Sequence, residues 1–277
     1  MGPWYSGPMA GIPATGVKLE RILLHRVGKA VADFGLIREG DHLAVALSGG
    51  KDSFGLLRLL HLLKRRSPIR FEITAVTVHN GSEFFQSGLL EDYLRREAIP
   101  FHLERTDITR IVEEKRRPGS PYCSLCARLR RGALYGAAAA LGCNKLALGH
   151  HLDDAAETLL MNLFFEGSIR SMPPKLLAEN GRITVIRPLL YVTESMLADY
   201  AAESGFPLID CGCWLCGTQD QERARMKALV RDVAERYPQV RRSVLSALGR
   251  VEARFLMDRS LYDFEKEELR RAPHEGN

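Results

Sequence analysis

Residues 42–53 read HLAVALSGGKDS, and this segment carries the clearest structural signal in the chain. Its first six residues form a short apolar run, which predicts a buried strand, and the following Ser-Gly-Gly predicts a loop. Residues 53–65 then have the spacing of a helix. Glycines let phosphate approach the backbone, and the N-terminus of a helix attracts anions. We therefore expect a nucleotide phosphate to bind here, at Ser48, Gly49, Gly50, Lys51, Asp52 and Ser53.

Strands and helices alternate on both sides of this segment. This alternation predicts an α/β fold, a doubly wound parallel sheet covered on both faces, with further helices at the N- and C-termini. Residues 166–182 contain a Pro-Pro pair and are expected to form a long loop. The expected strands are 71–79, 101–106, 145–149 and 183–190, and the expected helices are 17–35, 87–98, 126–142, 153–165, 193–204, 219–236 and 240–257.

Composition limits the class of protein. The chain has 277 residues, of which 45% are hydrophobic and 26% are charged, as in ordinary soluble domains. No apolar run approaches the roughly 20 residues that span a bilayer, and the N-terminus lacks the features of a secretory signal. We expect a cytoplasmic protein without membrane contact, and a net charge of +5 permits a polyanionic partner. The expected divisions are a flexible tail (1–16), one nucleotide-binding domain with a leading helix (17–218) and a helical extension (219–277).

A second polar motif, GHHLDDAAET, occupies residues 149–158 after a predicted strand. Gly149 would lie beside the nucleotide. The adjacent carboxylates of Asp153 and Asp154 could hold Mg²⁺ together with phosphate oxygens. They would also stabilise the N-terminus of a helix, which is an alternative role for them.

The cysteines form two groups. Among the six, Cys123 and Cys126 make a C-x-x-C pair, and Cys211, Cys213 and Cys216 lie close together later in the chain. On spacing alone, this pattern fits a redox pair, a four-cysteine zinc site or an iron–sulfur site. The remaining cysteine, at the end of a helical stretch, is expected to be a small buried hydrophobe: Cys143.

The whole SGGKDS string resembles the SGGxDS signature of PP-loop ATP pyrophosphatases, which cleave ATP between its α and β phosphates. Five further segments are similar to the tRNA 2-thiocytidine synthetase family within that group, and the resemblance runs from about residue 17 to about residue 250. They are CSLCARLRRG (123–132), GHHLDD (149–154), MPPK (172–175), IRPL (186–189) and CWLCGTQ (213–219).

The resemblance implies ATP, Mg²⁺ and a 4Fe-4S cluster whose open iron position binds sulfur. Cys123 and Cys126 would be two cluster ligands and Cys216 the third, with Cys213 as the runner-up. Asp154 would act at the α-phosphate side of the site in preference to Asp153. Thiouridine-forming relatives have a catalytic lysine where this chain has Arg130, which can clamp phosphate but cannot act as a base. Cys211 is an extra that the family pattern does not require.

The resemblance further implies that cytidine 32 of tRNA is adenylated and converted to 2-thiocytidine. A sulfur donor such as a cysteine desulfurase would be needed, and a homodimer is left open. Two alternatives also remain: another PP-loop enzyme, of the lysidine or 2-thiouridine type, and a zinc-stapled RNA-binding module without catalysis. RNA phosphates would meet basic side chains from several segments, among them Arg128, Arg130, Arg131, Lys64–Arg66, Arg70, Lys115–Arg117, Arg170, Lys175, Arg241 and Arg242.

Overall fold

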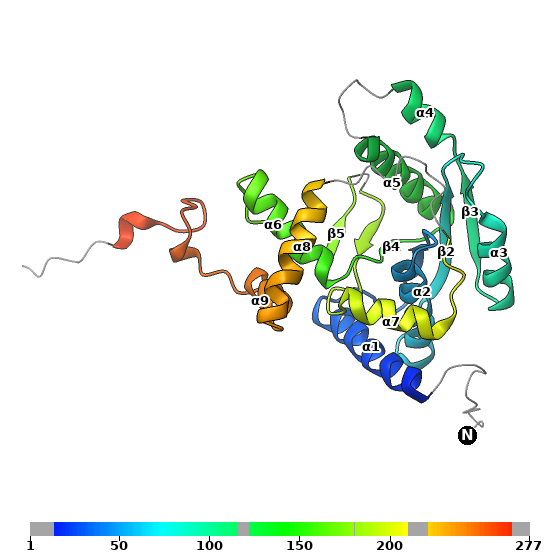
Figure 1. Ribbon diagram of the computed structural model, residues 1–277, viewed down its shortest axis with the longest axis horizontal. Helices are drawn as coiled ribbons and strands as arrows, with labels where there is room; N and C mark the ends of the chain where they lie inside the picture. The colour runs from blue at the N-terminus through cyan, green and yellow to red at the C-terminus, as the bar shows by residue number, and fades with distance from the viewer. Residues whose placement is uncertain (1–13, 116–121, 180, 210–220, 268–277) are drawn as a thin grey trace, which may run out of the picture.

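A six-stranded sheet lies at the centre of the molecule (Figure 1). The computed structural model describes residues 14–115, 122–179, 181–209 and 221–267. The strand order is β3-β2-β1-β4-β6-β5, and every neighbouring pair is parallel except β5 and β6. This confirms the doubly wound parallel sheet. The strands are β1 (His42–Ala46), β2 (Glu72–His79), β3 (Phe101–Arg105), β4 (Lys145–Ala147), β5 (Lys175–Leu177) and β6 (Thr184–Ile186).

Helices cover both faces of the sheet. One face carries α1 (Ala14–Asp33), α2 (Lys51–Arg66), α3 (Ser87–Arg96) and α7 (Glu194–Ser204). The other carries α4 (Ile108–Lys115) and α5 (Tyr122–Ala140). A third group packs together beside the sheet: α6 (Leu152–Phe165), α8 (Gln221–Arg236) and α9 (Val240–Leu248) (Figure 1). No helix within the described ranges is both long and apolar enough to cross a bilayer.

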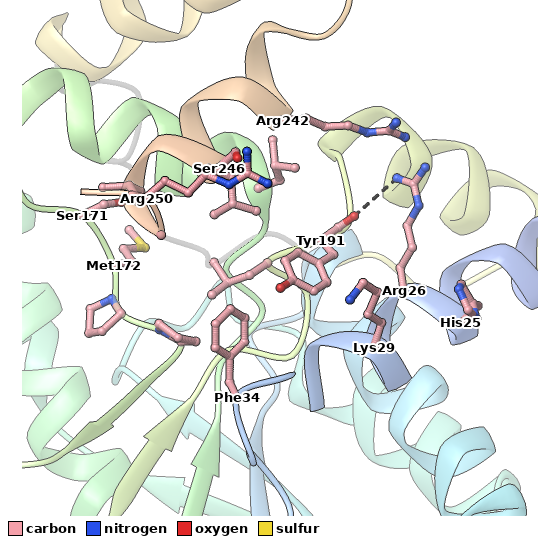
Figure 2. A pocket seen from close by; sticks show the side chains of 17 residues that line it. His25, Arg26, Lys29, Phe34, Ser171, Met172, Tyr191, Arg242, Ser246 and Arg250 are labelled. Carbon is pink, nitrogen blue, oxygen red and sulfur yellow. Dashed lines mark hydrogen bonds between the residues drawn. The ribbon is translucent and has the colours of Figure 1, made fainter. Parts of the chain in front are cut away.

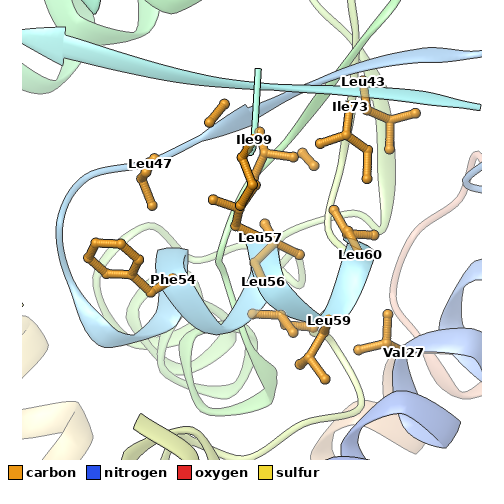
Figure 3. Close-up of a cluster of buried hydrophobic side chains, with 14 of the residues drawn as sticks. Val27, Leu43, Leu47, Phe54, Leu56, Leu57, Leu59, Leu60, Ile73 and Ile99 are labelled. Carbon is orange, nitrogen blue, oxygen red and sulfur yellow. The ribbon is translucent and has the colours of Figure 1, made fainter. Parts of the chain in front are cut away.

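Helix α2 is the most deeply buried of these elements. It lies between the sheet and the helices α1 and α7, so apolar side chains on more than one of its sides are covered (Figure 3). Burying a leucine side chain contributes about 2 kcal/mol. The core therefore holds α2, and the loop that precedes it, in a fixed position. Its buried side chains include Phe54, Leu56, Leu57, Leu59 and Leu60.

Three expectations about secondary structure were wrong. The loop expected at 166–182 contains β5, which is short enough to escape a pattern of alternating residues. Helix α4 was not expected. The helix expected at 240–257 ends at Leu248, because Gly249 at its C-cap interrupts the helix, and a short 3-10 turn follows at Ala253–Phe255. The domain divisions at residues 16 and 218 stay predictions.

The order of the strands creates a crevice. From β1 the chain continues through α2 to β2 and then to β3, which extends the sheet in one direction. The strands β4, β6 and β5 extend it in the other. The connections that follow β1 and β4 diverge from one another at the carboxyl ends of these two strands. Open α/β sheets bind ligands at such a point. Residues 48–53 and 149–154 leave the sheet at this point.

Candidate active site

The loop between β1 and α2 has the geometry of an anion cradle. Ser53 donates its Oγ hydrogen to the Gly50 carbonyl at 2.8 Å, and the Ser48 N–H donates to Ser53 Oγ at 3.2 Å. Gly50, at the N-cap of α2, provides no side-chain cap for the first turn. The Ser53 N–H donates to the Gly50 carbonyl at 3.1 Å, so the N–H groups of Lys51 and Asp52 before it are the ones that this end of α2 offers to phosphate oxygens.

Gly49 is required by its backbone. Its φ is +90°, and a Cβ added there would lie 2.9 Å from the Ile209 carbonyl oxygen. The Ile209 N–H also donates to the Gly49 carbonyl at 3.0 Å. The loop is therefore fastened to the segment that follows α7.

Replacing Gly49 with alanine should lower the free energy of unfolding by about 3 kcal/mol, because the left-handed backbone and the overlap with Ile209 both oppose a side chain. Gly50→Ala is the matched control. At that position φ is −82°, and the nearest atom to an added Cβ is Ser48 Oγ at 3.7 Å. Urea denaturation of both variants tests this, and equal losses of stability would contradict it.

Lys51 lies at the centre of a charge network. Its Nζ is 3.1 Å from Asp52 Oδ2 and 3.2 Å from Glu194 Oε1, and Glu194 also pairs with Lys227 at 2.8 Å. Burial lowers the pKa of Lys51, but the charges of Asp52 and Glu194 outweigh burial and raise this pKa overall. Lys51 is therefore a charged group at the start of α2, where it can meet phosphate.

The motif at residues 149–158 faces this loop. A Cβ at Gly149 would lie 3.2 Å from the backbone carbon of Asp52, so glycine permits close contact with the start of α2. His151 caps α6, because its ring accepts from the Asp154 N–H and Asp154 Oδ2 accepts from the His151 N–H at 2.9 Å. His151 is thus a buried capping residue.

The two adjacent acids differ in their surroundings. Asp153 is buried, its Oδ2 accepts from the Glu194 N–H at 2.8 Å, and its Oδ1 pairs with Arg241. Asp154 is more exposed and contacts His151. Across the crevice, Asp52 Oδ1 is buried and has no hydrogen-bond partner among the described residues. The carboxylates of Asp52 and Asp154 are therefore better placed for a cation than that of Asp153.

Those two carboxylates fit a magnesium ion only in company with phosphate. Within the described ranges, no group of three or more His, Cys, Asp or Glu side chains could hold a metal ion by itself. Mg²⁺ at nucleotide sites commonly takes one or two carboxylates and completes its shell with phosphate oxygens and water.

The C-x-x-C pair begins α5. This helix leads into the amino end of β4, so its first turn lies at the carboxyl edge of the sheet. Leu125 and Cys126 pack against a small cluster formed by Val78, Ile108 and Val112. Positions 123 and 126 are one helical turn apart, and the N-terminus of a helix favours thiolates. Arg130 follows one turn later and is half-buried. Two cysteines at this spacing suit a thiolate-bound cluster, and the assignment of Cys123 and Cys126 as its ligands stays a prediction.

Of the four other cysteines, Cys143 lies within the described residues and the remaining three do not. Cys211, Cys213 and Cys216 lie outside the described residues, so the choice of a third ligand stays a prediction. Cys143 is 5% exposed within a small apolar cluster, and burial raises the pKa of its thiol to about 11. The expectation of a small buried hydrophobe is confirmed.

Comparison with known proteins shows the family. A PP-loop domain matches residues 19–210. A tRNA-cytidine(32) 2-sulfurtransferase of Geobacter sulfurreducens is 55% identical over 235 residues, which cover 85% of this chain and 91% of that protein. One from Syntrophotalea carbinolica is 52% identical, with 91% and 98% covered. The chain belongs to the tRNA-cytidine(32) 2-sulfurtransferase family.

A solved structure agrees with the fold of this sulfurtransferase family member. It is the U34-tRNA thiolase NcsA from Methanococcus maripaludis with its 4Fe-4S cluster, which superposes with a TM-score of 0.69 at 19% sequence identity. The match covers 86% of this chain and 81% of that one. At this identity the likeness supports the shared fold.

Three further residues near the sulfurtransferase site were not among the site residues predicted from the sequence. The Glu194 carboxylate pairs with Lys51 and Lys227, and its backbone N–H donates to the Asp153 carboxylate. The local sequence indicates only that Thr193 and Glu194 begin a helix. Glu157 is buried inside α6 and lies 3.7 Å from Arg223. His150 is neutral at pH 7, because burial lowers its pKa to about 4. These residues surround the carboxylates on the side of α6 and α8.

Glu157 should make the stability of the protein depend on pH. Burial and the nearby charge of Asp154 raise its pKa from 4.5 to about 7. Between these values the folded state keeps a proton that the unfolded state releases, so this group lowers the free energy of unfolding as pH rises. Over the whole range between the two pKa values, the free energy of unfolding falls by about 3 kcal/mol.

Glu157→Gln should remove that dependence and become progressively more stable than the natural protein between pH 5 and pH 7.5. Glu166→Gln, at the exposed end of α6, is the control. Denaturation without ATP at several pH values gives the measurement. Parallel stability curves for Glu157→Gln and the natural protein would contradict the raised pKa.

Proposed function

We propose that this chain converts cytidine 32 of tRNA to 2-thiocytidine in an ATP-dependent reaction. Relatives that are 52–55% identical to it over 85–91% of the chain are named for this activity. The observation that carries the proposal is that the SGGKDS loop and the first turn of α5 both lie at the carboxyl edge of the sheet. This placement supports a reaction that combines ATP chemistry with thiolate chemistry.

In the first step the chain activates the base. The N–H groups at the start of α2 and the Lys51 ammonium bind the phosphates, and Asp52 and Asp154 would hold Mg²⁺, which would supply positive charge to the same phosphates. The C2 oxygen of the cytidine forms a bond to the α-phosphorus, and the bond from that phosphorus to pyrophosphate breaks. Lys51 and Arg130 stabilise the negative charge that develops on the phosphates. Asp153 acts as a positioning residue through Glu194 and Arg241.

In the second step sulfide replaces AMP at C2. Cys123, Cys126 and Cys216 would hold a 4Fe-4S cluster, with Cys213 as the alternative third ligand, and the cluster would supply the bound sulfide. Arg130, one turn after Cys126, holds the departing phosphate group. We place the reaction in the cytoplasm, with sulfur from a donor such as a cysteine desulfurase. A homodimer stays a prediction.

The product decides between this proposal and its alternatives. Protein reconstituted with iron and sulfide without oxygen is incubated with unmodified tRNA, ATP, Mg²⁺ and sulfide, and the nucleosides are analysed by mass spectrometry. We expect 2-thiocytidine, with AMP and pyrophosphate formed in equal amounts, and no product from tRNA with uridine at position 32. Lysidine or 2-thiouridine would reassign the substrate. Bound zinc, with tRNA binding but no ATP–pyrophosphate exchange, would indicate a module without catalysis.

A further inference from the structure

A second cavity lies apart from the phosphate loop, between the end of α1, the segment 171–174, the Leu190–Tyr191 turn and α9 (Figure 2). Its volume is about 950 Å³, which is at the upper end of the range of pockets for small organic ligands. None of the residues 48–53 lines it. Its inner wall is apolar and includes Leu152, Met172, Pro173, Leu190 and Leu245.

The rim of this cavity carries positive charge. Among its lining residues are Arg26, Lys29, Arg242 and Arg250, and no aspartate or glutamate. Lys29 is neutralised by Asp33 at 2.7 Å, outside the lining. Within the described part of the chain, Arg242 and Arg250 form no ion pair with a carboxylate. Arg26 donates to the Tyr191 carbonyl and to the Met196 sulfur instead of to an acid.

Two of these arginines repel one another. Figure 2 shows Arg26 from α1 and Arg242 from α9 with their guanidinium groups facing the same space. Burial, followed by the charge of Arg242, lowers the pKa of Arg26. Like charges in such proximity are unfavourable unless an anion lies between them. A phosphate bound between the two guanidinium groups would therefore stabilise this arrangement of the folded chain.

Aromatic rings lie beside the charges. Phe34 and Tyr191 pack with ring centroids 5.7 Å apart, and both line the cavity. Single-stranded nucleic acid binds where bases stack on aromatic rings and basic side chains follow the phosphates. An apolar cavity with aromatic side chains and a basic rim is therefore complementary to a nucleotide, which has a flat base and a charged phosphate.

Helix α9 places this cavity next to the active site. Arg241 pairs with Asp153, and the next residue, Arg242, lines the cavity. On the other side, Leu152 lines the cavity while its neighbours His151 and Asp153 face the catalytic crevice. A polynucleotide, unlike a free mononucleotide, would reach both places at once.

We propose that this cavity binds an unpaired nucleotide of the tRNA substrate other than the cytidine that reacts. Its base would lie against the apolar wall, and the phosphates on either side of the nucleotide would meet Arg26 and Arg242 at one side of the rim and Arg250 at the other. The proposal rests on the proposed function, because it takes tRNA as the substrate. The site would hold the RNA in register while the reacting base enters the crevice.

The test compares tRNA binding by the full-length double variant Arg242→Gln/Arg250→Gln with binding by the natural protein. Arg96→Gln, an exposed arginine on α3 paired with Glu97, is the control. We expect the double variant to raise the Kd for unmodified tRNA about tenfold and to lower the slope of log Kd against log salt by about 1.5, because two phosphate contacts are lost. ATP binding, measured by calorimetry without tRNA, should not change.

Each other outcome would overturn the proposal. If the natural protein makes 2-thiocytidine and the double variant binds tRNA with the same Kd and salt slope, the cavity does not contact RNA and the proposed function stands. If the variant loses only the binding of free CMP, the cavity takes a small nucleotide. If only the sedimentation of the protein changes, it takes a second copy of the chain. If the natural protein neither binds nor modifies tRNA, both proposals fail together.

Discussion

Replacing Cys126 with serine should lower 2-thiocytidine formation by about 1000-fold or more, which corresponds to a loss of about 4 kcal/mol of transition-state stabilisation. Serine is a poor ligand for iron, so the variant should also lose the bound iron and the visible absorption of the cluster. ATP should still bind, because residues 48–53 belong to a different connection of the sheet. Iron content, the absorption spectrum and nucleoside analysis give three separate readouts.

Cys143→Ala is the matched control for this loss. Cys143 lies in an apolar cluster with Ala137, Ala138 and Leu146, so its removal should cost only about 1 kcal/mol of stability and leave iron and activity intact. If Cys126→Ser kept both iron and activity, the assignment of Cys126 as a ligand would be wrong. Stoichiometric zinc in the natural protein after anaerobic purification would also contradict the cluster.

Replacing Lys51 with glutamine should reduce the rate of ATP–pyrophosphate exchange by about 100-fold or more, because a fixed positive charge is removed from where phosphate charge develops. Glu194 would keep Lys227 as a partner, so we expect little loss of stability. The effect should fall more on kcat than on KM, since the interaction strengthens as pyrophosphate departs.

Lys64→Gln is the control for charge removal on the same helix. Lys64 lies in the last turn of α2 and pairs with Glu72, far from the phosphate end of the helix. Its loss should leave exchange within about twofold of the natural protein, as expected for an exposed ion pair. Equal losses in both variants would mean that Lys51 acts only through general electrostatics.

Local patterns made the phosphate loop predictable. The strand, the glycines and the helix of residues 42–66 are adjacent in sequence, so periodicity and composition were sufficient to identify them. The same holds for His151 to Asp154, where the cap and the acids lie within one turn of α6. The pairing of Cys123 with Cys126 is local as well.

Contacts between distant segments were not predictable in this way. The Glu194 N–H meets the Asp153 carboxylate across 41 positions, and Arg241 meets it across 88. Nothing in the spacing of a single sequence pairs such residues, because the pairing follows from how helices pack after the sheet forms. The cavity beside α9 was missed for the same reason, although Arg242 was among the expected RNA contacts.

The neighbouring positions of β1 and β4 also limit when the site can exist during synthesis. The His42 N–H donates to the Asn144 side chain, 102 positions away, and the two strands pair directly beyond this contact. A ribosome that has released only residues 1–100 has therefore exposed SGGKDS without the strand and the acidic helix that complete its crevice. Pairings of such long range form late in folding. ATP should thus bind only after more than half of the chain has emerged, and its binding should report that the sheet is complete.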